Sequence, residues 1–261
     1  MDTVSIVILG SGNVATHLAN ALDKEYKVVQ VFSRHINNAH ELASTLKDCS
    51  YTDKIDKLIR DADLYLISVC DDAIEKIAND MPEVKGIVAH TSGSVDIHAL
   101  NGNGRSQGVF YPLQTFSKDK SLDISKVPFF IEASDSDTEK SLKDIASALS
   151  EKVYSIDSAQ RQTLHLAAVF ACNFFNHMLT VSSRILNTDG IGIDVMLPLI
   201  EATINKAMTM SPHEAQTGPA ARRDFSTITK HLDLLQGYDK EIYSIVTKAI
   251  IAETKKSERM K

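Results

Sequence analysis

A short stretch near the start of the chain constrains the fold more than any other. The apolar run Val4–Leu9 leads directly into Gly10-x-Gly12-x-x-Ala15, and apolar residues at helical spacing follow. Such a run is typical of a buried parallel strand. Gly10 would permit a tight turn, Gly12 a close backbone approach to a pyrophosphate, and Ala15 close packing of the helix on the strand. The glycine motif also occurs by chance, so its place between a predicted strand and a predicted helix is what favours dinucleotide binding.

The glycine turn and the ends of the neighbouring strands are therefore the expected cofactor site. A helix that starts at the turn would offer unpaired N–H groups and the positive end of its dipole to the pyrophosphate. The residues expected to contact the cofactor are Gly10, Ser11, Gly12, Asn13, Val14, Ser33, Arg34, Val69 and Ser92.

The end of the second predicted strand indicates which dinucleotide binds. An NAD site usually places an acidic residue there to accept hydrogen bonds from the ribose 2′-hydroxyl. This chain has Ser33-Arg34-His35 at that position, without a carboxylate. A guanidinium can hold phosphate oxygens in a bidentate manner, so the sequence favours NADP over NAD. The alternative is that Arg34 is an ordinary solvated loop residue.

Strand and helix signals alternate through the first 157 residues. This rhythm predicts an α/β domain with a Rossmann-type doubly wound sheet. Strands are expected at 4–9, 27–32, 50–52, 63–69, 86–89, 107–110, 128–132 and 152–156, and helices after Val14 and at 37–46, 54–60, 73–79 and 136–149.

After residue 157 the strand signals stop. One helix is expected over 158–186, and further helices at 194–210, 225–235 and 238–255. The sequence therefore predicts two domains, a dinucleotide-binding domain over 1–157 and an all-helical substrate or dimerisation domain over 158–261. The segment 211–224, which contains Arg222, is expected to be a loop, either a simple connection or a surface that faces an anion.

The helix predicted over 158–186 has a wide apolar face and an uncharged polar arc. Solvated helix faces are usually rich in charge, so this arc suggests a cleft or a helix–helix interface. His165 and Asn173 are the candidate catalytic residues, with His165 as proton donor, although a structural role for this histidine is an equal alternative. The arc consists of Gln162, His165, Asn173, Asn176, His177, Thr180, Ser183 and Arg184.

Composition narrows the possible partners. The formal net charge of -6 argues against a general nucleic-acid binder, and no unbroken apolar run reaches the ~18 residues of a membrane span. Cys49, Cys70 and Cys172 lack metal-ligand spacing, so no metal site is expected. Free thiols and the absence of a signal-peptide pattern predict a cytoplasmic protein.

Several motifs together resemble a known family. The glycine turn and the all-helical second half are similar to the NADP-dependent reductases related to pyrroline-5-carboxylate reductase. A closer resemblance is to a bacterial group assigned as NADP oxidoreductases, which pairs a Rossmann-like domain with a helical domain of uncharacterised function. The motifs that carry it are His90-Thr91-Ser92-Gly93-Ser94, Tyr111-Pro112-Leu113-Gln114, His165 with Asn173, and Thr217-Gly218-Pro219-x-x-Arg222-x-Asp224.

This resemblance implies a second domain like the carboxyl-terminal domain of 6-phosphogluconate dehydrogenases, and a homodimer. It implies substrate contacts at Tyr111, Gln114 and Arg222. The chain has Tyr111 where the family often has His, and Arg223 where it often has Gly. The family has no agreed substrate.

Two classes of function follow from these observations. The first is an NADP-dependent oxidoreductase that transfers a hydride between NADP(H) and a small carbonyl, imine or hydroxy acid. The second is an NADP-binding regulator or scaffold without turnover. Both predict cofactor binding, and only NADPH consumption separates them.

Overall fold

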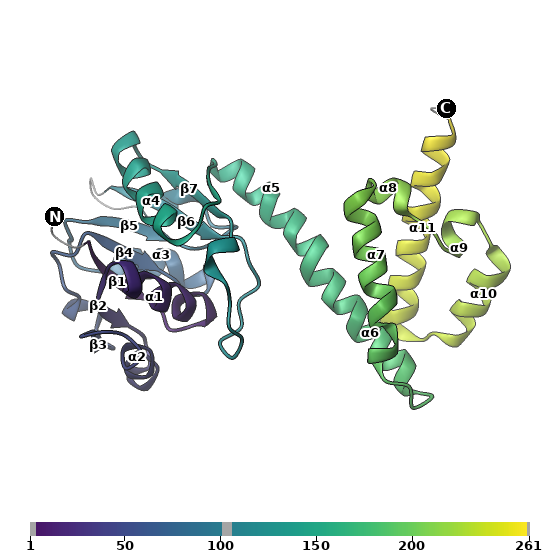
Figure 1. The fold of residues 1–261 in the computed structure, drawn as a ribbon, viewed down its shortest axis with the longest axis horizontal. Helices are drawn as coiled ribbons and strands as arrows, with labels where there is room; N and C mark the ends of the chain where they lie inside the picture. Colours follow the sequence, from purple (N-terminus) through teal and green to yellow (C-terminus); the bar gives the residue numbers. More distant parts are fainter. Residues whose placement is uncertain (1–3, 101–105, 260–261) are drawn as a thin grey trace. The chain divides into compact units, whose positions relative to one another are not determined.

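The computed structural model describes residues 4–100 and 106–259 and divides the chain into two compact units. The first unit is Met1–Val169 and the second is Phe170–Lys261. Figure 1 labels their helices and strands. The predicted domain boundary at residue 157 lies just before helix α5 (Ser158–Ala168), which belongs to the first unit in this division.

The first unit is built on a sheet of the order β3-β2-β1-β4-β5-β6-β7-β8. All neighbouring strands pair in parallel except β6 and β7, which are antiparallel. The predicted Rossmann-type sheet, followed by an all-helical part, is confirmed. The strands are β1 (Ser5–Leu9), β2 (Lys27–Phe32), β3 (Ser50–Thr52), β4 (Leu64–Ile67), β5 (Ile87–His90), β6 (Gln107–Pro112), β7 (Phe129–Ala133) and β8 (Val153–Ser155).

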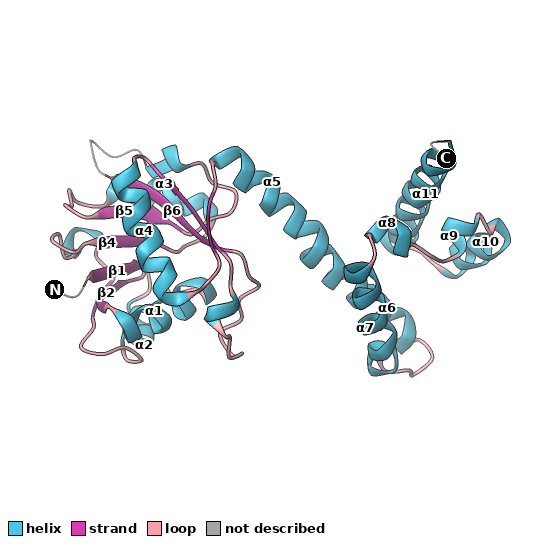
Figure 2. Cartoon of the chain, turned by 45° about the horizontal axis from the view of Figure 1, so that its top comes forward, coloured by secondary structure: helices cyan, strands magenta, loops and turns pink. Residues whose placement is uncertain are grey.

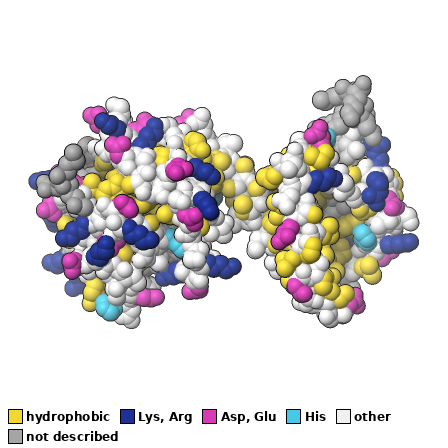
Figure 3. All heavy atoms as spheres, viewed as in Figure 1, with side chains coloured by type: hydrophobic (Ala, Val, Ile, Leu, Met, Phe, Trp, Pro, Cys, Tyr) yellow, Lys and Arg dark blue, Asp and Glu magenta, His cyan; other side chains and the backbone are white. Residues whose placement is uncertain are grey.

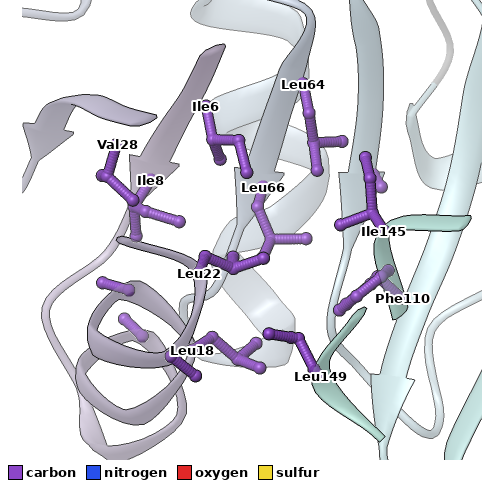
Figure 4. Close-up of a cluster of buried hydrophobic side chains, with 14 of the residues drawn as sticks. Ile6, Ile8, Leu18, Leu22, Val28, Leu64, Leu66, Phe110, Ile145 and Leu149 are labelled. Carbon is purple, nitrogen blue, oxygen red and sulfur yellow. The ribbon is translucent and has the colours of Figure 1, made fainter. Parts of the chain in front are cut away.

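Helices cover both faces of this sheet (Figure 2). Successive strand residues point to opposite faces, so Ile6 and Ile8 of β1 join one core while Val7 and Leu9 join the other. The first core includes α1 and α4 (Figure 4). It also includes α2, whereas the second core includes α3. The helices are α1 (Asn13–Glu25), α2 (Ile36–Ala43), α3 (Asp71–Asp80) and α4 (Ser136–Leu149), with 3-10 turns η1 (Ile55–Lys57), η2 (Ile97–Leu100) and η3 (Ile124–Lys126).

The helix predicted at 54–60 is wrong, because only the short turn η1 forms there. The buried side chain of Gln30 holds this segment in an irregular path. Its amide donates to the Lys57 carbonyl at 3.2 Å and its oxygen accepts from the Ile59 N–H at 2.9 Å. These bonds take the place of helical hydrogen bonds.

The long helix predicted over 158–186 is present but is not a regular α-helix. Helix α5 passes into a π-helical segment, η4 (Val169–Phe174), before α6 (Phe175–Asn187). A π-segment bonds i to i+5, and one inserted residue rotates everything beyond it by about 100°. The angular positions read at a constant helical period therefore apply only up to Ala168.

The second unit is helical, as predicted. The segment expected to be a loop over 211–224 contains two short helices, α8 and α9. Beyond α6 its elements are η5 (Ile193–Met196), α7 (Leu197–Thr209), α8 (Pro212–Ala215), α9 (Pro219–Arg222), α10 (Phe225–Leu234) and α11 (Gly237–Arg259).

Apolar side chains are widely exposed on the second unit (Figure 3). Among its described residues, only Ala220 and Ile228 are buried hydrophobics. Large residues of α7 are open, with Leu199 exposed to 61% and Met208 to 75%. Exposed apolar residues gathered on one surface commonly mark an interaction site.

One described helical run, Ser158–Asn187, is long and apolar enough to cross a membrane by length and composition alone. The sequence predicts this helix, but the absence of an unbroken apolar run gives no membrane-span candidate there. Its first turns hold Arg161, which is fully buried and paired with Glu132 of β7. That end of the run is thus an integral part of the first unit.

Candidate active site

A crevice of about 540 Å³ lies in the first unit, where the carboxyl ends of the parallel strands meet. Twelve of the fourteen site residues expected from the sequence line it, all except Asn173 and Arg222. They are Gly10, Ser11, Gly12, Asn13, Val14, Ser33, Arg34, Val69, Ser92, Tyr111, Gln114 and His165.

Two glycines shape one end of the crevice in different ways. Gly10 has φ +132°, and a Cβ on it would lie 2.0 Å from the Ser68 carbonyl oxygen. Gly10 is thus required for the fold. Gly12 is the N-cap of α1, and a Cβ there would meet nothing within 4 Å. Gly12 therefore leaves open space at the helix N-terminus, as a bound pyrophosphate would need.

The residues after β2 form the next part of the crevice. Ser33, Arg34, His35 and Asn38 line it, and the Ser33 hydroxyl lies 2.9 Å from the Ser11 hydroxyl. Among the described lining residues there is no carboxylate on this side. This surface suits a phosphate better than a ribose 2′-hydroxyl.

The side chain of Asn13 is engaged within the protein. Its amide donates to the Phe116 carbonyl at 3.1 Å, and His17 of the same helix contacts the Ser117 carbonyl at 2.9 Å. These bonds hold the segment after β6 against α1. Asn13 can therefore meet a cofactor through its backbone N–H at the start of the helix.

At the other end of the crevice, Tyr111 and His165 meet over Gly93. The Tyr111 hydroxyl and His165 Nδ1 share a hydrogen bond of 3.2 Å. A Cβ on Gly93 would lie 2.6 Å from His165 Nδ1 and 2.7 Å from Tyr111 Cζ. The backbone of Gly93 thus packs against the Tyr111 and His165 rings, which can exchange a proton.

The loop after β5 is held from both sides by Arg161 and His90, neither of which is among the predicted site residues. The fully buried Arg161 donates to the carbonyls of Ser92 at 3.1 Å and Val95 at 2.6 Å. His90 Nδ1 accepts from the Ser92 N–H at 3.2 Å. Burial, together with the charge of Arg161, lowers the pKa of His90 to about 4.

Ser92 itself is expected from the sequence to bind the cofactor. Its hydroxyl accepts from the backbone N–H groups of Ser94 and Val95, each at 3.1 Å. The side chain therefore shapes the loop, and Gly93 beside it presents backbone to the crevice. The one signal for this arrangement in the sequence is the run of small hydroxyl residues around the glycine.

The two remaining predicted residues belong to the second unit. Asn173 lies in the π-helical segment and Arg222 ends α9. Arg223, which stands where the family often has Gly, has φ +56°. This left-handed conformation at a helix end favours glycine, in keeping with the glycine that the resemblance implies at this position.

Comparisons with known proteins agree with this description. The model of a Rossmann-like domain matches residues 2–113, and the model described as a domain of unknown function, DUF2520, matches residues 127–250. No curated protein matches the chain.

Many solved structures are similar to the chain, and three of them cover at least 96% of it. The Bacteroides fragilis "putative NADP oxidoreductase" is 41% identical, with 96% of this chain and 98% of that chain covered and a TM-score of 0.87. The reductive aminase of Aspergillus terreus, in complex with NADPH and ethyl-5-oxohexanoate, is 13% identical, with coverages of 100% and 95% and a TM-score of 0.68.

The 1-pyrroline-5-carboxylate reductase of Streptococcus pyogenes is 13% identical, with coverages of 97% and 98% and a TM-score of 0.65. At these identities the last two structures show a shared fold. The resemblance stated from the sequence motifs is confirmed. The chain belongs to the family of the Bacteroides fragilis protein, and in this chain a Rossmann-like domain is followed by a DUF2520 domain.

Proposed function

We propose that this protein is an NADP-dependent oxidoreductase that transfers a hydride between NADP(H) and a small carbonyl, imine or hydroxy acid. The observation that carries the proposal is a single crevice with an open glycine turn at one end and the Tyr111–His165 pair at the other. The 41% identical relative, whose name is "putative NADP oxidoreductase", supports the same function.

The residues present fit a dinucleotide. Gly12 leaves the helix N-terminus open, and the strand β2 ends in Ser33 and Arg34 in place of an acid. The turn from Gly10 to Val14 would hold the pyrophosphate, Arg34 the 2′-phosphate, and Val69 and Ser92 the crevice wall. NADPH, when bound, would supply the hydride, and NADP⁺ would accept it in the reverse direction.

The protein would then orient the substrate and manage a proton. Tyr111 and His165 are within hydrogen-bond reach of each other, so a proton passed to the substrate by one can be replaced by the other. The half-buried site would limit access of water to the reacting atoms. Gln114 would contact the substrate near this pair. Asn173 and Arg222 of the second unit are proposed to orient a carbonyl and to bind a carboxylate.

NADPH oxidation across a panel of small carbonyls, imines and keto acids tests this function. Imines belong in the panel because two proteins of the same fold are named as a reductive aminase and a pyrroline carboxylate reductase. We expect NADPH to bind and at least one member to be reduced. Tight binding with no consumption by any member would favour the regulator without turnover.

Two further observations bear on the cellular location and the oligomeric state of the protein. All three cysteines are free thiols, which fits the reducing cytoplasm expected from the sequence. The exposed apolar residues of the second unit favour a homodimer.

A further inference from the structure

Arg161 is a charged side chain enclosed entirely within the first unit. It lies on the first turns of α5, and none of its surface is exposed. A buried cation is costly unless a counter-ion and hydrogen bonds compensate it. Glu132 of β7 supplies the counter-ion, with Oε2 at 2.9 Å from one guanidinium nitrogen and 3.3 Å from Nε.

The remaining guanidinium contacts reach the loop that follows β5. One nitrogen donates to the carbonyls of Ser92 and Val95, and another donates to Ser158 Oγ at 3.0 Å. The planar fork of arginine is suited to several directed bonds of this kind. Arg161 thus ties together three segments, namely β7, the start of α5 and the loop after β5.

The same loop and the same helix carry the proposed reaction centre. His165 lies four residues after Arg161, so the two side chains leave neighbouring turns of one helix face. Gly93 follows Ser92 directly, and the His165 ring lies against it. The spacing between the His165 ring and Gly93 therefore depends on how α5 is held against this loop.

We propose that Arg161 is a positioning residue that, with Glu132, fixes His165 above Gly93 and beside the Tyr111 hydroxyl. It acts through these neighbours and does not touch the reacting atoms. Its consequence for turnover rests on the proposed function, whereas its effect on His165 is a property of the protein alone.

The alternative is an ion pair that only stabilises the fold. Two variants of the full chain separate the alternatives. Arg161→Lys keeps the charge but loses the fork. Glu132→Met with Arg161→Met replaces the pair by apolar side chains of similar volume, an exchange that buried ion pairs often tolerate. Lys143→Met is the control, because it removes an ion pair with Glu139 on the surface of α4.

Three measurements are made on each folded variant: the NMR signals of the His165 ring, assigned with His165→Gln, the NADPH affinity, and kcat and KM with a substrate from the panel. We expect the His165 signals to move in both Arg161 variants. We expect kcat to fall at least about tenfold, while KM and the NADPH affinity change less than about threefold, as misplacement of a catalytic group predicts. Lys143→Met should match the wild type in all three.

Unchanged His165 signals in a folded Arg161 variant would overturn the proposal, as would a loss confined to KM or to NADPH affinity. If both variants fail to fold, Arg161 serves the fold alone and the proposal is wrong. If the wild type reduces no member of the panel, the proposed function fails, and the His165 signals still decide the role of Arg161.

Discussion

The hydroxyl of Tyr111 and Nδ1 of His165 share a hydrogen bond of 3.2 Å, and both rings lie against the backbone of Gly93. Tyr111 comes from β6 and His165 from α5, which are far apart in the sequence. The pair lines the same crevice as the glycine turn. A proton-transfer unit within reach of a dinucleotide site is the feature from which the first prediction follows.

Removal of either member of this pair should lower kcat without lowering the affinity for NADPH. We expect His165→Gln to lower kcat by about 100-fold to 10,000-fold, the usual range for a general acid or base. Tyr111→Phe should also lower kcat, and the double variant should lose little more than His165→Gln because the two residues act as a unit. NADPH oxidation and NADPH fluorescence titration measure both quantities. Tyr154→Phe, on the half-exposed β8, is the matched control. An NADPH affinity that falls in step with kcat would contradict the assignment.

Alanine at the two glycines of the turn should separate folding from binding. Gly10→Ala should lower the melting temperature, since its Cβ would overlap the Ser68 carbonyl in a left-handed backbone. Gly12→Ala should melt like the wild type, because its Cβ meets no protein atom, yet should bind NADPH at least about tenfold more weakly by occupying the pyrophosphate space. Calorimetry measures the melting temperature of each variant, and fluorescence titration measures its affinity for NADPH. Normal NADPH binding by Gly12→Ala would refute the assignment of the turn.

The side chains at the end of β2 should select NADP over NAD. Arg34→Ala should weaken NADPH binding by about tenfold or more, because a charge-assisted contact to the 2′-phosphate is lost. The affinity for NADH should stay nearly unchanged. Ser33→Asp should disfavour NADPH further, since it restores an acid near the ribose. The ratio of the two dissociation constants is the measurement. Equal wild-type affinities for NADPH and NADH would show that this surface does not discriminate.

The buried His90 should make the protein less stable in acid. Its folded pKa of about 4 lies below the ordinary value of 6.5, through burial and the nearby Arg161 charge. Above the unfolded pKa the group has no effect. As the pH falls from 6.5 to 4, protonation favours the unfolded chain, by about 3 kcal/mol in total. Protonation of Nδ1 would also remove the bond from the Ser92 N–H.

His90→Gln should remove this part of the pH dependence. Urea unfolding of the wild type and the variant at pH 7.5, 6 and 5 gives the difference, in which the other histidines cancel. Parallel stability curves for the two proteins would show that His90 does not carry the effect.

Self-association should bury the apolar residues of the second unit. Since Ala220 and Ile228 are its only buried hydrophobics among the described residues, the unit has little core of its own. We expect light scattering at micromolar concentration to give about twice the chain mass of 28.7 kDa. A mass near that of one chain would rule out a stable dimer.

The sequence predicts the first unit well because its signals are local. Strand, glycine turn and helix follow one another within a few residues, and the carboxyl ends of parallel strands must meet at one edge. Twelve predicted residues accordingly line one crevice. The short helices α8 and α9 could also have been expected, since Ser211 with Glu214 forms a capping box and Pro219 starts a helix at its first turn.

Other features depend on contacts that no local pattern records. The π-helical segment Val169–Phe174 changes the helical period within an apolar run, and a plot at constant period misses it. In the sequence, Arg161 resembles a surface arginine. In the fold, β7 and the loop after β5 bury it. The role of Gln30 in preventing a helix at 54–60 is likewise set by tertiary contacts.

Gly93 has a consequence for how this family can vary. Because a methyl group at position 93 would collide with both His165 and Tyr111, the three positions are not independent. A homologue with a side chain at the position of Gly93 should also carry a smaller residue at one of the other two. An alignment of relatives should therefore show these three columns changing together, and a relative without the glycine should lack one member of the Tyr111–His165 pair.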